Sequence, residues 1–453
     1  MSQPHVIVVG AGFAGLAAAR ELENAGIKVD IYEARDRVGG RAWTEERMGR
    51  PLELGATWVH WYQAHVWQEV TRYDQKIVAS PEPEHVAWRT ADGEVQTGSL
   101  EQADELMAEP LDKIFARASE YFPQPFQSDW IMSDEFDGPE ELREQFYADD
   151  QRSVLDVVKA AGKFSQEQID LISAYWSAAY IGNPGTGSSL MAKHWYAMSD
   201  ENRRLMDDIT LKWKLVNGMA GIYNAMASDL KSPIHLNTPV TSVEHTSDGV
   251  TVTLNGGEQV TADSIIVTVP VGALENIEFS PALPDGIQSV IAQKWNTEGA
   301  KIWIKIKGHH KFLGYAPYPA KMSVIRSEYF MDDDTTILVG FGGDHKNVDL
   351  NSVEDAQEIM DQWNAGFEVV DAAGHDWGAD KWSGQAWGTL RAGQFTNGWT
   401  HFRNTGTRLY FAGSELGKGW RGVCVDSALE SGMSTARRVL QAVQQQQSLG
   451  ASL

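Results

Sequence analysis

The sequence predicts an α/β protein that begins with a Rossmann-type dinucleotide-binding unit. His5 to Val9 reads as a buried strand, the glycine-rich turn Gly10 to Gly15 follows it, and Leu16 to Asn24 reads as a helix. Lys28 to Tyr32 then reads as a second strand, which ends at the acidic Glu33. A strand, a helix and a second strand within roughly 30 residues form a βαβ unit and indicate a parallel sheet. At about 150 residues per domain, the 453-residue chain is long enough for two or three domains.

The glycines of the turn have separate roles in binding a dinucleotide. Gly10 makes the tight turn, Gly12 lets the backbone approach a pyrophosphate, and Gly15 lets the helix pack closely on the strand. The first turn of the helix offers unpaired N–H groups and a positive dipole to phosphate. Glu33 can accept hydrogen bonds from two ribose hydroxyls and would repel a 2′-phosphate. Strand, helix and acid all fall where this binding mode needs them.

The next segment favours FAD over NAD as the cofactor. Arg35-Asp36-Arg37-Val38-Gly39-Gly40-Arg41 is glycine-rich and basic, and it follows the ribose-binding acid directly. We expect a second phosphate-contacting segment of this kind where a long cofactor lies extended across the sheet. An NAD-binding Rossmann domain does not need one.

The composition excludes several other classes of function. The chain has 38 Lys and Arg against 62 Asp and Glu, and this net charge of −24 argues against nucleic acid and anionic membranes as partners. The charge is compatible with a cationic substrate, although solubility alone explains it equally well. The single cysteine, Cys424, excludes intramolecular disulfides and sites built from several cysteines, and we expect no metal.

The N-terminus predicts a cytoplasmic protein. Met1 to Pro4 leads directly into an apolar strand, without the basic stretch and small-residue cleavage site of a signal peptide. The longest nearly apolar run, Val6 to Ala19, is too short to span a membrane and is interrupted by glycines.

Two motifs resemble those of the flavin amine oxidase superfamily. Arg35 to Arg41 resembles its RxGGR signature, and Leu409 to Glu415, followed by a helix from Ser427 to Leu440, looks like its second flavin motif. The resemblance implies a glutathione-reductase-type FAD-binding Rossmann domain, interleaved with a substrate domain of mixed sheet and helices, as in monoamine oxidases. We expect residues 1–75, 215–300 and 385–445 to form the FAD-binding domain, and residues 76–214 and 301–384 to form the substrate domain.

The resemblance also implies which residues bind FAD. Val240 ends a short strand before the hairpin-like segment Ser242 to Val260, and in the family this valine reaches the adenine end through its backbone. Ile265 to Pro270 reads as a strand that returns into the FAD-binding domain. The expected cofactor-binding residues are Gly10, Gly12, Ala14, Gly15, Glu33, Ala34, Arg35, Gly40, Arg41, Gly55, Ala56, Thr57, Trp58, Val240, Trp377, Gly413, Ser414, Glu415 and Val425.

Lys301 is the candidate catalytic residue. Ala300 to Ile306 alternates apolar and polar residues as a strand does. Lys301 matches the lysine that family members hold near flavin N5 through a water molecule, where it orients water or assists reoxidation. Alternation alone does not distinguish Lys301 from a solvent-facing lysine such as Lys305, so the position in the family pattern carries this assignment.

The substrate-binding candidates follow from the aromatic walls of amine oxidases. Trp387 matches the first of two aromatic side chains that stand beside the amine, with a buried core residue as the alternative. At the second wall many relatives have a tyrosine, whereas this chain has Val423 and Cys424. We interpret Cys424 as a small buried hydrophobic residue rather than a nucleophile. Mammalian monoamine oxidases attach flavin to a cysteine at the position of Ala386, so we expect non-covalent FAD.

Trp58 bears on the identity of the amine. L-amino acid oxidases have an arginine for the substrate carboxylate at this position, so its absence argues against amino acid substrates. Trp58-Val59-His60-Trp61 looks most like bacterial nicotine- and pseudooxynicotine-type amine oxidases, and Trp387 with Arg391 to Phe395 is similar to 6-hydroxynicotine oxidases.

The predicted function is therefore an FAD-dependent amine oxidase. It would oxidise the C–N bond of a small secondary, cyclic or alkaloid-like amine by hydride transfer to FAD, giving an imine or iminium. Reoxidation by O2 would release hydrogen peroxide, with another electron acceptor left open. Alternatives are an oxidase of 6-hydroxynicotine, cycloalkylamine or polyamine type, an FAD-dependent desaturase, and a non-catalytic flavoprotein. The oligomeric state stays open, with a homodimer as one option.

Overall fold

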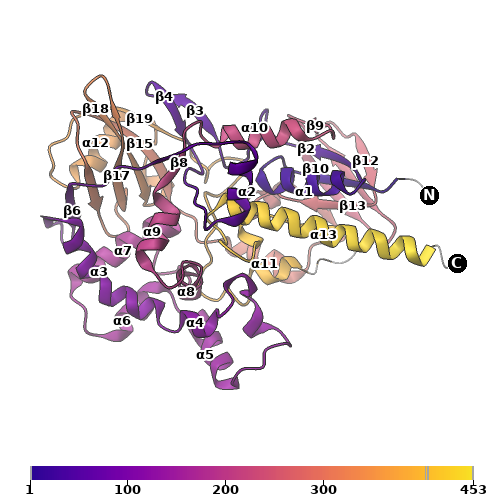
Figure 1. Cartoon of the computed structure of the whole chain (residues 1–453), viewed down its shortest axis with the longest axis horizontal. Coiled ribbons are helices and arrows are strands. Elements are labelled where there is room, and N and C mark those ends of the chain that lie inside the picture. Colours follow the sequence, from indigo (N-terminus) through magenta and orange to yellow (C-terminus); the bar gives the residue numbers. More distant parts are fainter. Residues whose placement is uncertain (1–2, 404, 406–407, 451–453) are drawn as a thin grey trace.

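The fold is seen in a computed structural model that describes residues 3–403, 405 and 408–450, the last five of these by their backbone only. In Figure 1 the chain forms two lobes that lie side by side. The right-hand lobe contains the first βαβ unit and the long C-terminal helix, and the left-hand lobe contains a large sheet with helices below it. Both chain ends lie at the outer end of the right-hand lobe.

The first sheet is parallel and is assembled from distant parts of the chain. Its strand order is β20-β13-β1-β2-β9, and each neighbouring pair is parallel. The predicted strands β1 and β2 are confirmed at their predicted bounds, whereas β13 ends at Val267 rather than Pro270. The bounds are β1 (His5–Val9), β2 (Lys28–Tyr32), β9 (Ile234–His235), β13 (Ser264–Val267) and β20 (Leu409–Phe411).

Helices α1 (Phe13–Asn24) and α13 (Val425–Gly450) pack against each other over this sheet. Helix α1 begins three residues before the predicted Leu16, so the last glycine of the turn already belongs to its first turn. Gly432 faces the backbone of Ala14, where a Cβ atom would lie 2.2 Å from the Ala14 carbonyl oxygen. The two helices therefore approach closely because a glycine stands at their contact.

A second sheet, with strand order β12-β11-β10-β14, corrects one expectation. Val240 begins strand β10 rather than ending a strand, because its backbone already pairs with Leu254 across the hairpin. The bounds are β10 (Val240–His245), β11 (Val250–Leu254), β12 (Gln259–Ala262) and β14 (Glu278–Ser280).

The left-hand lobe contains a mixed sheet with strand order β19-β15-β18-β17-β16-β6-β7. Strand β15 (Ala300–Lys307) is buried on both faces, although its sequence alternates. Ile302 and Ile304 pack toward α12, while Lys301 and Trp303 face the other side, where the chain from Glu53 to Trp58 covers them. The remaining bounds are β6 (His85–Arg89), β7 (Val95–Gly98), β16 (Phe312–Tyr315), β17 (Val324–Met331), β18 (Thr335–Gly342) and β19 (Val369–Gly374).

Helices and two short two-stranded sheets complete the fold. Helices α3 to α9 lie below the large sheet in Figure 1. The helices are α2 (Ala64–Arg72), α3 (Leu100–Phe115), α4 (Ala118–Tyr121), α5 (Glu140–Asp150), α6 (Val154–Ala161), α7 (Gln166–Tyr180), α8 (Ser189–Ala197), α9 (Arg203–Leu211), α10 (Ala220–Asp229), α11 (Asp285–Gln293) and α12 (Val353–Asp361). The short pairs are β3 (Thr44–Arg47) with β4 (Arg50–Glu53), and β5 (Ile77–Ala79) with β8 (Trp213–Leu215).

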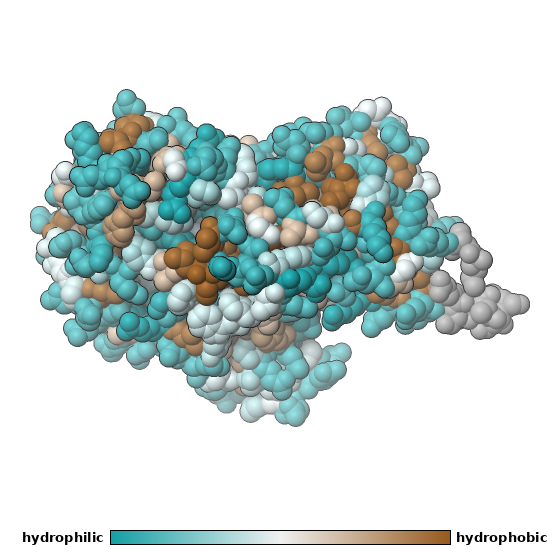
Figure 2. Space-filling view, turned by 45° about the horizontal axis from the view of Figure 1, so that its top comes forward, coloured by the Kyte–Doolittle hydropathy of each residue, from teal (hydrophilic) through white to brown (hydrophobic). Residues whose placement is uncertain are grey.

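The face of the molecule in Figure 2 is largely hydrophilic, with hydrophobic side chains gathered in a few patches. Within the described part of the chain, no helix combines the length and the apolar character that crossing a membrane requires.

Candidate active site

A long cavity runs between the first sheet and the segments predicted to bind the cofactor. Its empty volume is about 1440 Å³ including its open mouth. The glycine turn, the end of the second strand and the C-terminal flavin motif all line it, as expected for an extended dinucleotide. The predicted residues that line it are Gly10, Gly12, Ala14, Glu33, Ala34, Arg35, Gly40, Arg41, Gly55, Ala56, Val240, Lys301, Trp377, Trp387, Gly413, Ser414, Val423, Cys424 and Val425.

The glycine turn has the geometry that a pyrophosphate needs. Gly10 has φ of 104°, which favours glycine, and a Cβ atom on it would lie 2.5 Å from the Thr268 hydroxyl oxygen. Gly12 and Gly40 face each other across the cavity floor, so neither side chain blocks the approach of a phosphate. Gly15 does not line the cavity, but a Cβ atom there would lie 1.9 Å from the Gly10 carbonyl oxygen, so it keeps helix and strand close.

Glu33 is buried at the end of β2 and lines the cavity. Its Oε2 accepts a hydrogen bond from the Ala11 backbone N–H at 2.7 Å, and its Oε1 accepts one from the Arg35 N–H at 2.8 Å. These bonds fix the carboxylate, and each oxygen retains a second lone pair for a ribose hydroxyl. The residues of this cavity therefore fit FAD.

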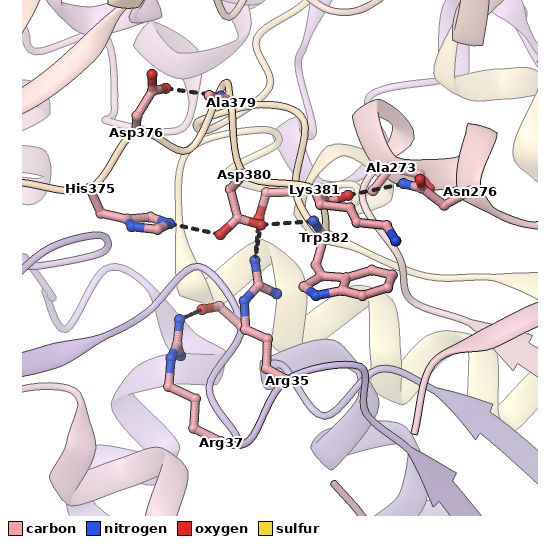
Figure 3. A network of polar contacts seen from close by, with 12 residues as sticks. Arg35, Arg37, Ala273, Asn276, His375, Asp376, Ala379, Asp380, Lys381 and Trp382 are labelled. Carbon is pink, nitrogen blue, oxygen red and sulfur yellow. Dashed lines mark hydrogen bonds and ion pairs between the residues drawn. The ribbon is translucent and has the colours of Figure 1, made fainter. Parts of the chain in front are cut away.

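Arg35 belongs to a polar network that joins the cavity to a distant segment (Figure 3). Its Nη2 donates to Asp380 Oδ1 at 2.6 Å, and Asp380 also bonds to His375 Nε2 at 2.7 Å. Burial alone would raise the pKa of Asp380, but the His375 and Arg35 hydrogen bonds outweigh it and hold that pKa well below its usual range. Asp380 is thus a fixed negative charge that positions Arg35. This partner could not be predicted from the sequence because the two residues are 345 positions apart.

Arg41 connects the first and last cofactor motifs. Its Nη1 donates to Glu415 Oε1 and to the Ala386 carbonyl oxygen, each at 2.6 Å, and its Nη2 lies 3.2 Å from Ser414 Oγ. Glu415 is buried, is not among the residues that line this cavity, and contacts Arg41. The partly buried Arg41–Glu415 ion pair joins the two motifs.

A second cavity of about 2310 Å³, also counted with its open mouth, meets the first. Both are lined by Ala56, Trp387, Val423 and Cys424. The predicted residues Thr57 and Trp58 line the second cavity and not the first. The junction therefore brings the predicted substrate residues together at one end of the cofactor cavity.

Lys301 lies beside this junction and is 4% exposed. Its Nζ donates to the carbonyl oxygens of Glu53 and Gly55, each at 2.7 Å, and to the Thr57 hydroxyl oxygen. Burial lowers the pKa of Lys301 below its usual range, while the nearby Glu53 carboxylate acts in the opposite direction. Three protein acceptors hold the amine in one place against the cavity wall.

The wall of the second cavity includes an aromatic row that the sequence analysis only partly predicted. Phe341 of β18 lies between Trp58 and Trp387, with ring centroids 5.6 and 5.9 Å away. Trp387 Nε1 donates to the Ala179 carbonyl oxygen at 3.2 Å, which fixes its ring. Phe341 was missed because every residue of β18 is buried, so its pattern does not tell a cavity-facing side from a core-facing side.

Cys424 also lines this cavity and accepts a hydrogen bond from Gln63 Nε2, with a donor–acceptor distance of 3.0 Å. Burial raises the pKa of its thiol, which disfavours the reactive thiolate. Ala386 lines the cofactor cavity and has no group that could attach to a flavin. Within the described residues no group of three or more His, Cys, Asp or Glu side chains is arranged to hold a metal ion.

Comparisons with known proteins agree with this geometry. A sequence model of the family described as flavin containing amine oxidoreductase matches residues 13–440. Pseudooxynicotine dehydrogenase from Pseudomonas sp is 31% identical over 439 residues, which cover 96% of this chain and 85% of that protein. Nicotine dehydrogenase from Pseudomonas putida (strain DSM 28022 / S16) is 30% identical over 441 residues, covering 96% and 88%. The solved structure of putrescine oxidase bound to putrescine has a TM-score of 0.78 at 23% identity, covering 97% of this chain and 99% of that one.

Proposed function

The chain belongs to the family of flavin containing amine oxidoreductases, and from this premise we propose that it oxidises a small amine to an imine or iminium. The amine loses one hydride and one proton, and O2 accepts the two electrons and two protons to give hydrogen peroxide. The observation that supports this most directly is the junction of the two cavities, where Trp387, Val423 and Cys424 line both.

When FAD is bound, its isoalloxazine ring supplies the acceptor for the hydride that leaves the carbon next to nitrogen. The protein's contribution is to hold the amine in the orientation that this transfer needs. Trp387 offers an aromatic face that stabilises partial positive charge on the amine. No protein acid or base is required for hydride transfer itself, and none of the predicted site residues forms a carboxylate pair at the junction.

We assign to Lys301 an electrostatic role in the reduction of O2 at the junction, since its three N–H donors are all taken by protein acceptors. Its ammonium is held by Glu53, Gly55 and Thr57 on one side and lies 5.4 Å from the Trp58 ring centroid on another. A positive charge at this place would favour the negative charge that develops as O2 is reduced. Its role is therefore expected in reoxidation more than in amine oxidation.

The substrate we propose is a secondary, cyclic or alkaloid-like amine without a carboxylate. Two relatives at about 30% identity are named for nicotine and pseudooxynicotine. The cationic residues that line the second cavity are Arg203, Arg204, Lys212 and Arg326. Arg203 pairs with Asp104 and Lys212 with Asp208. The Arg326 guanidinium is engaged by Glu328 at 3.0 Å and by the backbone oxygens of Pro81 and Leu211. A substrate carboxylate would have to compete with that buried pair.

Anaerobic flavin reduction tests the proposed function. The purified protein should be yellow, and secondary or tertiary amines such as pyridine alkaloids should bleach it, with peroxide released in stoichiometric amount when air is admitted. Cycloalkylamines and polyamines serve as the comparison classes. If no amine of the whole panel bleaches the flavin, the proposed function is wrong. Bleaching without release of peroxide would mean that the electron acceptor is a compound other than O2.

Lys301→Met tests the residue assignment. The variant should be reduced by amine at a rate close to that of the wild type, whereas its reoxidation by O2 should slow by about tenfold or more, because one charge at the reacting centre is lost. Lys305→Met is the matched control, since Lys305 lies on the same strand but pairs with Asp333 at the surface. Unchanged reoxidation in Lys301→Met would remove this lysine from the mechanism.

A further inference from the structure

A chain of buried polar side chains leads away from Trp58, and its first member, Ser80, also lines the second cavity. Trp58 Nε1 donates to Ser80 Oγ at 3.1 Å, and the Ser80 hydroxyl donates to Glu328 Oε2 at 2.9 Å. Ser80 is 5% exposed and Glu328 is 3% exposed. The Ser80 hydroxyl has one proton, which it uses to donate the hydrogen bond to Glu328. Its oxygen accepts the hydrogen bond from the Trp58 indole N–H. The direction of both bonds is therefore fixed.

Glu328 is held rigidly at the far end of this chain. The Lys214 ammonium forms an ion pair with its Oε2, and Arg326 Nε lies 3.0 Å from its Oε1. Lys214 is on β8 and is 3% exposed, while Glu328 and Arg326 are on β17. A buried carboxylate with two cations and a hydroxyl donor has its charge compensated and cannot rotate freely.

Backbone pairing also holds Trp58 next to Lys214 of β8. Residues Trp58 and Lys214 form an isolated antiparallel bridge, and Ser80 N donates to the Lys212 carbonyl oxygen at 2.7 Å. Trp58, Ser80 and Lys214 therefore sit at fixed relative positions before any side chain is considered. Only the rotamer of the Trp58 side chain then remains to be determined, and the hydrogen bond to Ser80 selects it.

The selected rotamer places the indole where it contacts both other parts of the site. Its ring lies 5.4 Å from Lys301 Nζ and 5.6 Å from the Phe341 ring centroid, and Trp58 lines the second cavity. Trp58, Phe341 and Trp387 therefore form one continuous aromatic surface of this cavity. A separate aromatic cluster of Tyr175, Trp176 and Trp195 also lines it.

We propose that Ser80 and Glu328 are positioning residues that hold the Trp58 indole as part of the aromatic surface of the amine site. The proposal rests on the proposed function, because it assigns the second cavity to the amine. Loss of the Ser80 hydroxyl frees the indole to rotate and leaves its N–H without a partner, while Glu328 Oε2 keeps its ion pair with Lys214. Amine binding should weaken, while the cofactor cavity, which Ser80 and Glu328 do not line, should be unchanged.

A double-mutant cycle between Ser80 and Trp58 tests this proposal. The measured quantities are the amine dissociation constant and the limiting rate of anaerobic flavin reduction, from single-turnover kinetics of the holoenzyme. Ser80→Ala should raise the dissociation constant about threefold to tenfold, the range that one hydrogen bond supplies. Trp58→Phe, which removes the indole N–H, should raise it as well. If Ser80 acts through Trp58, Ser80→Ala should add little to Trp58→Phe.

The controls separate positioning from a general loss of stability. Ser80→Thr keeps the hydroxyl and should restore most of the binding, and Glu328→Gln should weaken binding less than Ser80→Ala because it keeps an acceptor oxygen. Ser173→Ala is the matched control, since Ser173 is buried and accepts from the Tyr318 N–H but lines neither cavity. If Ser80→Ala does not fold, Ser80→Cys takes its place in the cycle.

Two results would overturn the proposal. One is an unchanged dissociation constant in Ser80→Ala; the other is the same fold loss on the Trp58→Phe background as on the wild type. A failure of the proposed function is distinguishable, because then the wild type itself is not reduced by any amine.

Discussion

At the scale of single residues, the burial of Lys301 is the feature with the clearest chemical consequence. Its ammonium is 4% exposed and depends on three protein oxygens in place of water. Burial disfavours the charged form, and the Glu53 carboxylate compensates for only part of this cost, so the pKa of Lys301 lies below the ordinary lysine value of 10.5. The same burial raises the pKa of Glu53 above its usual range. The two groups therefore titrate as a pair.

This pair predicts how reoxidation depends on pH. Below the pKa of Lys301 the side chain is charged and assists the reduction of O2; above it the charge is lost. The second-order rate constant for reoxidation should therefore fall as the pH rises, with a midpoint below 10.5. Stopped-flow reoxidation of amine-reduced enzyme measures it. Lys301→Met should be slow and flat across the same range, and Glu53→Gln should move the midpoint to lower pH, because it removes the neighbouring negative charge. A wild-type profile without a midpoint below 10.5 would contradict this assignment.

Residues whose role follows from their position within a short sequence motif could be predicted from the sequence. Gly10, Gly12 and Glu33 follow from the spacing of one βαβ unit, and the structure brings them to one cavity. Asp380 and Phe341 could not be predicted, because their importance comes from neighbours that are far away in the sequence or from the face of a fully buried strand.

At the scale of elements, the N-terminus of α2 is completed by another helix. Its N-cap, Gln63, provides no side-chain hydrogen bond to the helix. Instead Asp426, in the first turn of α13, accepts from the backbone N–H groups of His65 at 2.6 Å and Val66 at 2.9 Å. The carboxylate therefore acts as a cap from outside the helix and joins α2 to α13. The helix predicted from Ser427 to Leu440 is present but extends further at both ends. Nothing in its sequence pattern indicated that its first turn caps α2.

Asp426→Ala should destabilise the holoenzyme by about 1–3 kcal/mol, because two N–H groups at the start of α2 lose their buried acceptor. Chemical denaturation followed by circular dichroism measures the loss. Asp426→Asn keeps one acceptor oxygen and should cost less. Ser352→Ala removes the N-cap of α12, whose hydroxyl oxygen accepts from the Asp355 N–H, and provides a comparison far from the site. Equal stability of Asp426→Ala and wild type would mean that water replaces the carboxylate without loss.

At the scale of the whole molecule, the cofactor cavity is assembled from stretches that lie far apart in the sequence. Its walls come from residues 9–56, 239–301, 375–387 and 413–428. The motifs predicted which stretches meet, because each resembles a flavin-binding segment. They did not predict how the stretches are joined, since the Arg41–Glu415 and Arg35–Asp380 pairs connect residues 374 and 345 positions apart. Pairs of this kind are set by three-dimensional packing, which one sequence does not display.

A cavity built in this way predicts that FAD is required for the stability of the whole molecule and is still removable. The chain has no cysteine at Ala386, and its single cysteine is at position 424, so acid precipitation should release all the flavin into the supernatant as intact FAD. The protein without cofactor should unfold at a lower temperature, because a ligand that binds only the native state stabilises it by mass action. FAD at a hundred times its dissociation constant contributes about 2.7 kcal/mol, which corresponds to about 3 °C for a chain of this length. Differential scanning calorimetry over a titration of FAD measures the shift.

Arg41→Met should weaken the shift at a given FAD concentration, because the first and last motifs then lose the side chain that joins them. Flavin that stays with the precipitated protein, or a melting temperature that does not change with FAD, would show that the cofactor is held in another way.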